Sequence, residues 1–544
     1  MPTVAETIVS AFLVEKTTHV FCVPGESYLA VLDALYDARE QIDLITCRHE
    51  AAAANMADAY GKLTGRAGVC MVTRGPGATH ASIGIHTAFQ DSTPLVMFVG
   101  DVGTDMVGRE AFQEIDYSRY FGAFAKAVMP LDRPERAPEV LARAFALAVS
   151  GRPGPVVVTL PEDLLLKEAP KAVQIAAPPA MSAPSPADVE SLAVLLADAE
   201  RPILWLGGPG WRQEDCENVR QFAEAAHIPV ITSWRRKDRF DNLDPHYAGE
   251  LGLGANPKLV ERVESSDLIV ALGTRLGEVT SLGYTLPAVP VPNQRLVHIH
   301  PDADTLSNVR RPTLAMQSSI GPACAALAEI GRRGAGGRGM DWCSGARADY
   351  ETWTQATAVQ SGVNMAAVIQ TLSRKLPAAT AYANGAGNFA SWLHRFHHHR
   401  QLGTQLAPTS GAMGYGVPAA IAAALIRDAR TVCVAGDGDF LMSGSELATA
   451  ARYGAKVLFI IVDNAQFGTI RMHQERDFTG RQSGTALTNP DFAAYAESFG
   501  VKGWTVTETE AFDSALTEAL AQDGPALICC RTDPDEISPG RRLG

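Results

Sequence analysis

Short runs of β-branched and other apolar residues alternate with helix-like stretches along nearly the whole chain. GVCMVT at residues 68–73 leads through a Gly-rich turn and a helix-like stretch to PLVMFVG, and TVCVA at 431–435 leads through GDGDF to VLFIIVDN. Strands separated by crossovers of this length pair in parallel, and helices cover the faces of such sheets. The alternation therefore predicts an α/β fold built on doubly wound parallel sheets.

Two breaks interrupt this pattern. Residues 165–190 are rich in Ala, Pro and Ser and lack an amphipathic period, and residues 330–342 read IGRRGAGGRGMDW, as expected of linkers. A single core stops growing at roughly 250 to 300 residues, so a chain of 544 residues needs several domains. We expect three, at residues 1–165, 188–332 and 350–533. The outer two look alike, and the middle one has candidate strands in PILWLGG, IPVITS, DLIVALG and RLVHIH.

Charge, cysteine usage and hydropathy limit the possible partners. A net charge of −13 argues against nucleic acid, whose binding needs clustered positive charge. The nine scattered cysteines contain no CxxC pair, which indicates buried thiols in a reducing compartment. We find no signal-peptide pattern and no apolar run long enough for a bilayer. We expect a cytoplasmic protein without membrane contact.

The tripeptide GDG at residues 436–438 is followed by Asn464 at the end of the next apolar run. This spacing places Asp437 and Asn464 at the carboxyl ends of neighbouring strands, where open α/β sheets bind ligands. Carboxylate and amide oxygens suit Mg²⁺, whose other ligands are often phosphate oxygens, and glycines let the backbone approach phosphates. The motif predicts a magnesium and diphosphate site, although GDG alone could equally be a turn at the end of a strand.

The segment AGDGDFLMSGSELATAARYGAKVLFIIVDNAQFGTI resembles the metal and diphosphate motif of thiamine diphosphate enzymes. Three further segments are similar, in this order, to the pyrimidine domain of acetohydroxyacid synthases: CRHEAAAANMADAYGKLTG, TRGPGATHASIGIHTAFQDSTPLV and AFQEIDY. The chain thus resembles the acetohydroxyacid synthase, pyruvate decarboxylase and benzoylformate decarboxylase group. The resemblance implies an acetolactate synthase-like lyase or transferase that uses thiamine diphosphate and Mg²⁺. It also implies pyrimidine-binding, central and diphosphate-binding domains, and a homodimer or homotetramer with active sites between subunits.

The resemblance assigns roles to particular residues of the third domain. It implies that Asp437 and Asn464 bind the metal through their side chains and Gln466 through its backbone carbonyl. The Met413 side chain is implied to lie beneath the cofactor and bend it. The implied cofactor contacts in this domain are Asn388, Gly411, Met413, Gly436, Gly438, Asp439 and Asn464.

Four residues of the first domain are candidate catalytic residues. Glu50 corresponds to the glutamate that binds the pyrimidine ring and shifts it toward its imino form, whose nitrogen can accept the thiazolium C2 proton. Gln113 matches a glutamine that contacts substrate. His80 replaces a more usual asparagine, and Glu26, an aspartate in pyruvate decarboxylases, could supply a proton late in the reaction. The alternatives are helix-terminal carboxylates, a surface amide and a structural histidine.

Two positions depart from the acetohydroxyacid synthase pattern. The segment GTRLGEVTS keeps Arg275 but has Glu278 where the family uses an arginine to hold the acceptor carboxylate, and His473 stands at the position of a pocket tryptophan. An acid there removes a charge-assisted hydrogen bond and adds repulsion. We therefore expect a second 2-oxo acid to be a poor acceptor. In place of that reaction, we expect simple decarboxylation of a 2-oxo acid, transfer to an aldehyde acceptor, or use of an acyl-CoA substrate.

Other functions remain open. The first alternative is a 2-hydroxyacyl-CoA lyase with the same cofactor. A nicotinamide-dependent oxidoreductase is suggested by LGGPGW at residues 206–211, which lacks the third glycine of the dinucleotide motif. A non-catalytic cofactor-binding regulator is disfavoured by the presence of Glu50, and FAD by His300, which replaces the first acid of a pair ending at Asp302.

Two charged runs carry no clear function in the sequence. RRKDR at residues 235–239 could hold a coenzyme A phosphate, but short charged runs usually form a solvated surface, and we expect that here. HHH at 397–399 lacks further ligands at zinc spacing, so we expect it at a surface or an interface.

Overall fold

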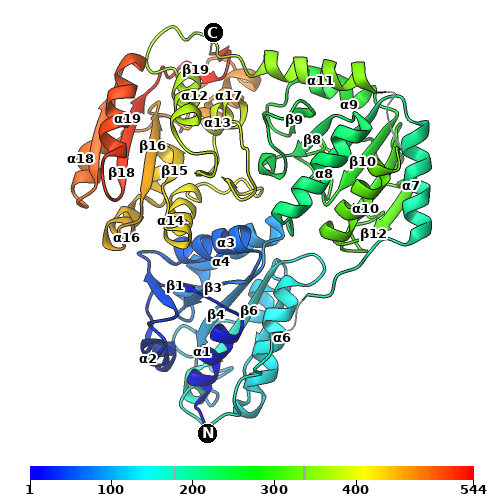
Figure 1. Ribbon diagram of the computed structural model, residues 1–544. Coiled ribbons are helices and arrows are strands. Elements are labelled where there is room, and N and C mark those ends of the chain that lie inside the picture. Colours follow the sequence, from blue (N-terminus) through cyan, green and yellow to red (C-terminus); the bar gives the residue numbers. More distant parts are fainter. Residues whose placement is uncertain (177–178, 335–338, 544) are drawn as a thin grey trace.

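The computed structural model describes residues 1–176, 179–334 and 339–543. Three six-stranded sheets follow one another along the chain, and helices cover each of them (Figure 1). All neighbouring strands within these three sheets are parallel. The expected α/β class with three doubly wound parallel sheets is confirmed.

The first sheet has the strand order β2-β1-β3-β4-β6-β5. Its apolar runs are buried on both faces: in β3, Cys70 and Val72 belong to the core shared with α3 and α4, whereas Val69 and Met71 belong to the core shared with α1, α2 and α6. The strands are β1 His19–Cys22, β2 Asp43–Thr46, β3 Gly68–Val72, β4 Leu95–Asp101, β5 Ala127–Pro130 and β6 Pro155–Pro161. The helices are α1 Val4–Val14, α2 Leu29–Asp37, α3 Glu50–Thr64, α4 Pro76–Asp91, α5 Tyr117–Phe121 and α6 Ala137–Val149.

The third sheet repeats this topology, with the order β14-β13-β15-β16-β18-β17, so the outer domains share one architecture as expected. A short antiparallel hairpin, β19 Glu536–Ser538 and β20 Arg541–Arg542, follows it. The strands are β13 Ala381–Asn384, β14 Gln405–Leu406, β15 Thr431–Gly436, β16 Val457–Asp463, β17 Lys502–Val506 and β18 Ala526–Arg531. The helices are α12 Met365–Lys375, α13 Ala390–Phe396, α14 Gly416–Arg427, α15 Asp437–Leu441, α16 Leu447–Arg452, α17 Gly468–Asp477, α18 Phe492–Glu497 and α19 Phe512–Leu520.

The middle sheet has a different order, β12-β11-β10-β7-β8-β9. The four expected strands are present as β7 Pro202–Leu206, β8 Val230–Ser233, β10 Leu268–Leu272 and β11 Arg295–His300. Sequence analysis missed the edge strands β9 Tyr247–Leu251 and β12 Leu314–Gln317, because YAGEL and LAMQ contain no β-branched residue. The helices are α7 Pro186–Asp198, α8 Gln213–Ala226, α9 Pro257–Glu264, α10 Ile320–Arg332 and α11 Met340–Trp353.

The domain bounds stay a prediction, but packing adds detail to them. The chain buries Ala169 and Ala172 in the core of the first domain, beyond residue 165. Helix α11 runs through the expected start of the third domain at 350 and packs on the middle sheet, where the Tyr350 ring meets Tyr247 edge to face with centroids 5.0 Å apart. Within the two expected linkers, residues 177–178 and 335–338 lie outside the described residues.

The expectation that RRKDR forms a solvated surface is wrong. Arg235, Arg236, Lys237 and Asp238 are buried where the middle domain meets the other two. Arg236 Nη2 donates to Asp91 Oδ1 of the first domain at 3.1 Å, and Lys237 Nζ donates to the carbonyl of His397 in the third domain at 2.7 Å. Burial is possible because oxygens of the neighbouring domains accept hydrogen bonds from the three cations, and the Gly403 N–H donates to Asp238 at 2.8 Å.

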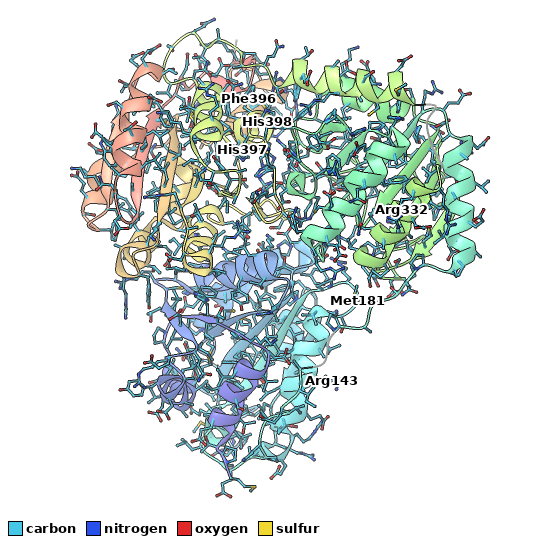
Figure 2. All side chains as sticks on the ribbon, viewed as in Figure 1. Arg143, Met181, Arg332, Phe396, His397 and His398 are labelled. Carbon is cyan, nitrogen blue, oxygen red and sulfur yellow. The ribbon has the colours of Figure 1, made fainter. Side chains whose placement is uncertain are left out.

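The histidine run lies at an interface inside the chain rather than on its surface. Figure 2 places His397 and His398 on the side of the third domain that faces the middle domain. His398 Nδ1 and the Tyr350 hydroxyl are 3.0 Å apart, and the backbone N–H of His399 donates to Asn242 Oδ1 at 2.9 Å. Burial lowers the pKa of all three histidines, so they are neutral packing residues.

The first and third domains meet along helices α3 and α14, which lie side by side near the centre of the molecule (Figure 1). Both helices are rich in alanine, and one continuous core contains the buried side chains of both. All nine cysteines are free, and all except the half-buried Cys216 are buried, as expected of structural thiols. No helix among the described residues is long and apolar enough to cross a membrane.

Candidate cofactor and active site

The candidate cofactor residues of the third domain converge on one cavity of about 220 Å³. They come from the segments that follow β13, β14, β15 and β16, so they gather at the carboxyl edge of the sheet as parallel topology requires. Aromatic and aliphatic side chains of the same domain complete the wall. The predicted residues that line the cavity are Asn388, Gly411, Met413, Gly436, Asp437, Gly438, Asp439, Asn464 and Gln466.

Asp437 is a buried carboxylate that forms no ion pair with a cation among the described residues. It begins α15 directly after β15 and is only 3% exposed. Asn489 Nδ2 donates to Asp437 Oδ2 and to Asp463 Oδ1, each at 2.8 Å, which brings a second carboxylate close. Burial raises the pKa of Asp437 to about 6, and no Lys, Arg or His side chain among the described residues forms an ion pair with it. A bound cation would offset the cost of burying this charge.

The other predicted metal and diphosphate residues lie on the loop after β16 and on the facing segment. Asn464 Oδ1 accepts a hydrogen bond from the backbone N–H of Gln466 at 3.2 Å, which closes a tight turn around Ala465 with φ 54°. The Thr469 hydroxyl donates to Asn388 Oδ1 at 2.9 Å and accepts from the Asn388 backbone N–H at 3.0 Å. These contacts fix the position of both asparagines before any ligand binds.

Asp439 lines the cavity, but its Oδ1 accepts two hydrogen bonds from the protein backbone. The N–H of Ala386 donates to it at 3.1 Å and that of Gly414 at 2.9 Å. Burial raises the pKa of Asp439 to about 7, and these two hydrogen bonds oppose the shift. We therefore interpret Asp439 as a structural residue that links the loops after β13 and β14, which flank the cavity.

The glycines of GDG leave room for two aromatic side chains that pack against the backbone. A Cβ atom on Gly436 would lie 2.7 Å from Phe389 Cδ1, and one on Gly438 would lie 2.6 Å from Phe467 Cε1. Both aromatic rings also line the cavity. A bare backbone next to a buried carboxylate and amide oxygens suits a magnesium-bound diphosphate. The residues present thus fit the cofactor that the sequence motif predicts.

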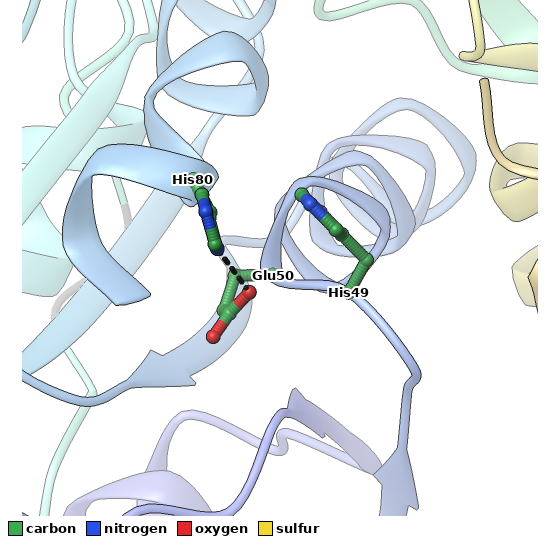
Figure 3. A group of neighbouring side chains, drawn as sticks. All are labelled: His49, Glu50 and His80. Atoms are coloured by element: carbon green, nitrogen blue, oxygen red, sulfur yellow. Dashed lines mark hydrogen bonds and ion pairs between the residues drawn. The ribbon is translucent and has the colours of Figure 1, made fainter. Parts of the chain in front are cut away.

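The four candidate catalytic residues of the first domain follow successive strands at the carboxyl edge of its sheet. Glu26 follows β1, Glu50 follows β2, His80 lies in α4 after β3, and Gln113 follows β4. Figure 3 shows the His80 ring pointing toward Glu50, with His80 Nδ1 and Glu50 Oε2 3.0 Å apart. The Glu50 side chain is 13% exposed, so it is accessible but mostly shielded.

Gln113 and Glu26 lie differently with respect to Glu50. A Cβ atom on Gly77 would lie 3.5 Å from Glu50 Oε1, and one on Gly75 would lie 2.8 Å from Gln113 Cβ, so Glu50 and Gln113 adjoin the same Gly-rich turn. The Glu26 side chain is 79% exposed, and its nearest cation is Arg74, at 3.8 Å. The structure joins Glu50 and His80 by a hydrogen bond, places Gln113 beside the same turn, and leaves the Glu26 side chain largely exposed.

Sequence analysis missed three residues that support these groups. His49 precedes Glu50, caps α3 and stacks on His80 with ring centroids 4.7 Å apart. Glu446 of the third domain accepts from the backbone N–H groups of Arg48 and His49 at 2.9 and 3.0 Å, and so holds the turn before Glu50. Asn489 lies outside any motif, and only the fold brings it to Asp437.

Within the described part of one chain, the candidate cofactor residues of the third domain and the candidate catalytic residues of the first domain do not line the same cavity. Among the described residues, only those of the third domain line the cavity, and none of the first-domain candidates is among them. The two outer domains share one topology, and each has polar residues at the carboxyl edge of its sheet. The cavity contains a buried carboxylate that pairs with no cation among the described residues. These features are typical of α/β proteins that bind a cofactor.

Comparison with known proteins identifies the family. The chain matches the N-terminal TPP binding domain of thiamine pyrophosphate enzymes over residues 2–120, their central domain over 189–327 and their C-terminal TPP binding domain over 385–530. The chain belongs to the thiamine pyrophosphate enzymes, in a group of 2-oxo acid decarboxylases and carboligases. The expected enzyme class and the thiamine diphosphate binding domains are confirmed.

The relatives cover nearly the whole chain. Acetolactate synthase isozyme 2 large subunit of Escherichia coli is 30% identical over 96% of this chain and 94% of its own length. The acetolactate synthase large subunit of Parasynechococcus marenigrum is 32% identical over 94% and 84%. The structure of a thiamine diphosphate-dependent 4-hydroxybenzoylformate decarboxylase from Rhodococcus jostii matches with a TM-score of 0.85 and 25% identity, over 98% of this chain and 100% of that one.

Proposed function

We propose that this chain is a thiamine diphosphate and Mg²⁺ dependent carbon–carbon lyase or ligase that acts on a 2-oxo acid. The observation that carries this proposal is the gathering of all predicted third-domain residues around one cavity, with the buried carboxylate of Asp437 unpaired by any cation among the described residues. Asp437 and Asn464 would hold the metal through side-chain oxygens, and Gln466 through its carbonyl. Asn388 and the glycine backbone would bind the diphosphate.

Glu50 is the proposed acid–base residue. When bound, thiamine diphosphate supplies a carbon nucleophile for the substrate carbonyl and a sink for the electrons released with carbon dioxide. Glu50 Oε2 holds or releases a proton, and His80 Nδ1, 3.0 Å away, orients the carboxyl group. Gln113, next to the same turn, binds a substrate oxygen through its amide, and Met413 supports the cofactor from the wall of the cavity.

We further propose that the active enzyme is a homodimer or homotetramer. The cavity is lined by the third domain alone, and the Glu50 group lies on the first domain, so a second copy of the chain must supply the missing half of each site. Apolar side chains at the carboxyl edges of both sheets are exposed in the single chain, in agreement with a subunit contact there. These are Met106, Val107 and Phe112 of the first domain and Leu441, Met442 and Ile470 of the third.

Chelation tests the cofactor assignment. Treatment with EDTA followed by gel filtration is expected to remove Mg²⁺ and thiamine diphosphate together, because the metal would link Asp437, Asn464 and the diphosphate. Decarboxylation of a panel of 2-oxo acids should return only when both are added back. Full activity after addition of a nicotinamide or flavin nucleotide alone would contradict the proposal.

The substrate prediction is that pyruvate is converted slowly to acetolactate. Glu278 is exposed on the middle domain after β10, and His473 lies on α17, which adjoins the cofactor cavity. An acid in place of a carboxylate-binding cation removes a hydrogen bond worth about 1.5 to 3 kcal/mol. We expect the enzyme to decarboxylate a 2-oxo acid, to use an aldehyde acceptor or to cleave a 2-hydroxyacyl-CoA faster than it forms acetolactate. Product analysis distinguishes these reactions. Acetolactate formation on the order of 10 per second or more would contradict this prediction.

A further inference from the structure

Arg235, in the charged run that sequence analysis assigned to the surface, extends from the middle domain to the wall of the cofactor cavity. Its Nη2 donates to the carbonyl of Gly385 at 2.8 Å, and its Nη1 donates to the carbonyl of Pro408 at 2.5 Å. Gly385 precedes Ala386, the first cavity residue after β13, and Pro408 precedes the cavity residue Gly411 after β14. One guanidinium group therefore holds the starting points of both loops.

The Pro408 carbonyl also defines the turn that presents Gly411. It accepts a hydrogen bond from the Gly411 N–H at 3.1 Å, and Gly411 has the left-handed φ of 71°. Asp439 binds the same two loops through the N–H groups of Ala386 and Gly414. The two loops are thus held through carbonyls by Arg235 and through amides by Asp439.

Burial and contacts with its neighbours restrict the Arg235 side chain. The residue is 2% exposed, its backbone has φ 62°, and its backbone N–H donates to the Glu250 side chain. The guanidinium carbon lies 4.2 Å from the centre of the Trp234 ring. A planar guanidinium donates along two fixed directions, which a lysine ammonium cannot reproduce.

We infer that Arg235 is a positioning residue through which the middle domain holds the thiamine diphosphate cavity in its binding shape. This inference rests on the proposed cofactor site. Arg235 does not line the cavity; it acts by fixing the loops that begin at Gly385 and Pro408. Without it, only Asp439 would link these loops, so they would be less ordered before the cofactor binds, and the additional conformational entropy lost on binding would weaken affinity.

Arg310 provides a matched control within the same domain. It is 4% exposed and, like Arg235, donates to two carbonyls, from Nε to Pro287 at 2.8 Å and from Nη1 to Leu276 at 2.9 Å. Both acceptors belong to the middle domain. Replacing either arginine by methionine removes a buried guanidinium and its hydrogen bonds, but only Arg235→Met should affect the cofactor loops.

The experiment measures thiamine diphosphate binding by titration calorimetry at saturating Mg²⁺, and thermal unfolding without cofactor, for full-length wild type, Arg235→Met, Arg235→Lys and Arg310→Met. Both methionine variants are expected to unfold at lower temperature than wild type. The dissociation constant should rise by roughly tenfold or more for Arg235→Met, and by less for Arg235→Lys. It should stay close to that of wild type for Arg310→Met.

Unchanged affinity in Arg235→Met would overturn the inference, and so would equal weakening in Arg310→Met, which would show a general effect of lost stability. If Arg235→Met does not fold, Arg235→Lys decides, with unchanged affinity again counting against the inference. Wild-type protein that fails to bind thiamine diphosphate would instead refute the proposed function, so the two failures are distinguishable.

Discussion

Asp437→Ala is expected to abolish retention of thiamine diphosphate while the chain stays folded. Asp437 is the buried carboxylate at the start of α15, and the proposed metal would be its only cationic neighbour among the described residues. Removing a direct metal ligand costs more than removing a supporting residue, which typically costs 10- to 100-fold in affinity. We expect the affinity for the cofactor with Mg²⁺ to fall by about 100-fold or more, measured by calorimetric titration.

The same variant should unfold at an equal or higher temperature when cofactor is absent. Burial raises the folded-state pKa of Asp437 to about 6, above its usual value of 3.8. The ionised carboxylate therefore costs folding free energy above about pH 6, and this cost is relieved as the pH falls below the folded pKa. Removal of the side chain at pH 7 removes the cost, so lost binding cannot be attributed to lost folding.

Asp463→Asn is the matched control for this prediction. Asp463 Oδ1 accepts a hydrogen bond from the same Asn489 amide at 2.8 Å, but Asp463 does not line the cavity. An asparagine keeps an oxygen to accept that bond, so cofactor retention should be close to that of wild type. Retention by Asp437→Ala, or equal loss in Asp463→Asn, would count against Asp437 as the metal ligand.

The sequence predicted well those features that depend on chain neighbours. GDG and Asn464 come at the ends of β15 and β16, and Glu50 and His80 lie near the N-terminal ends of the helices that follow β2 and β3. Parallel topology places these positions at one edge of each sheet. The apolar runs of the strands were visible for the same reason, because strands buried on both faces are continuously hydrophobic. Local pattern and topology indicated Asp437, Asn464 and the glycines of GDG, whereas the other residues that line the cavity were implied by the family resemblance.

The features that sequence analysis missed depend on contacts between distant segments. Arg235 looks like a surface residue because nothing near it in sequence satisfies its polar atoms; its partners are the carbonyls of Gly385 and Pro408 in the third domain. Asn489 reaches Asp437 across the sheet edge in the same way. A charged residue with partners in another domain carries no local signal of burial.

Glu50→Gln is expected to retain thiamine diphosphate but to lose exchange of its C2 proton by about 100-fold or more. Diphosphate and metal contacts would provide most of the binding free energy, and these belong to the third domain rather than to Glu50. Glutamine has the shape of glutamate and can still contact His80 Nδ1, which is 3.0 Å from Glu50 Oε2, but its amide cannot hold and release a proton. The two effects should therefore separate.

Quenched-flow exchange into deuterium, read by NMR on the extracted cofactor, measures the C2 step, and calorimetric titration measures affinity. Glu26→Gln is the control, because Glu26 is a second carboxylate at the same sheet edge whose side chain is 79% exposed and forms no described contact with Glu50. We expect it to exchange the C2 proton at the wild-type rate and to slow only steps after decarboxylation. Exchange at the wild-type rate in Glu50→Gln would show that another group activates the cofactor, and equal loss in both variants would show that Glu50 has no special part in proton transfer.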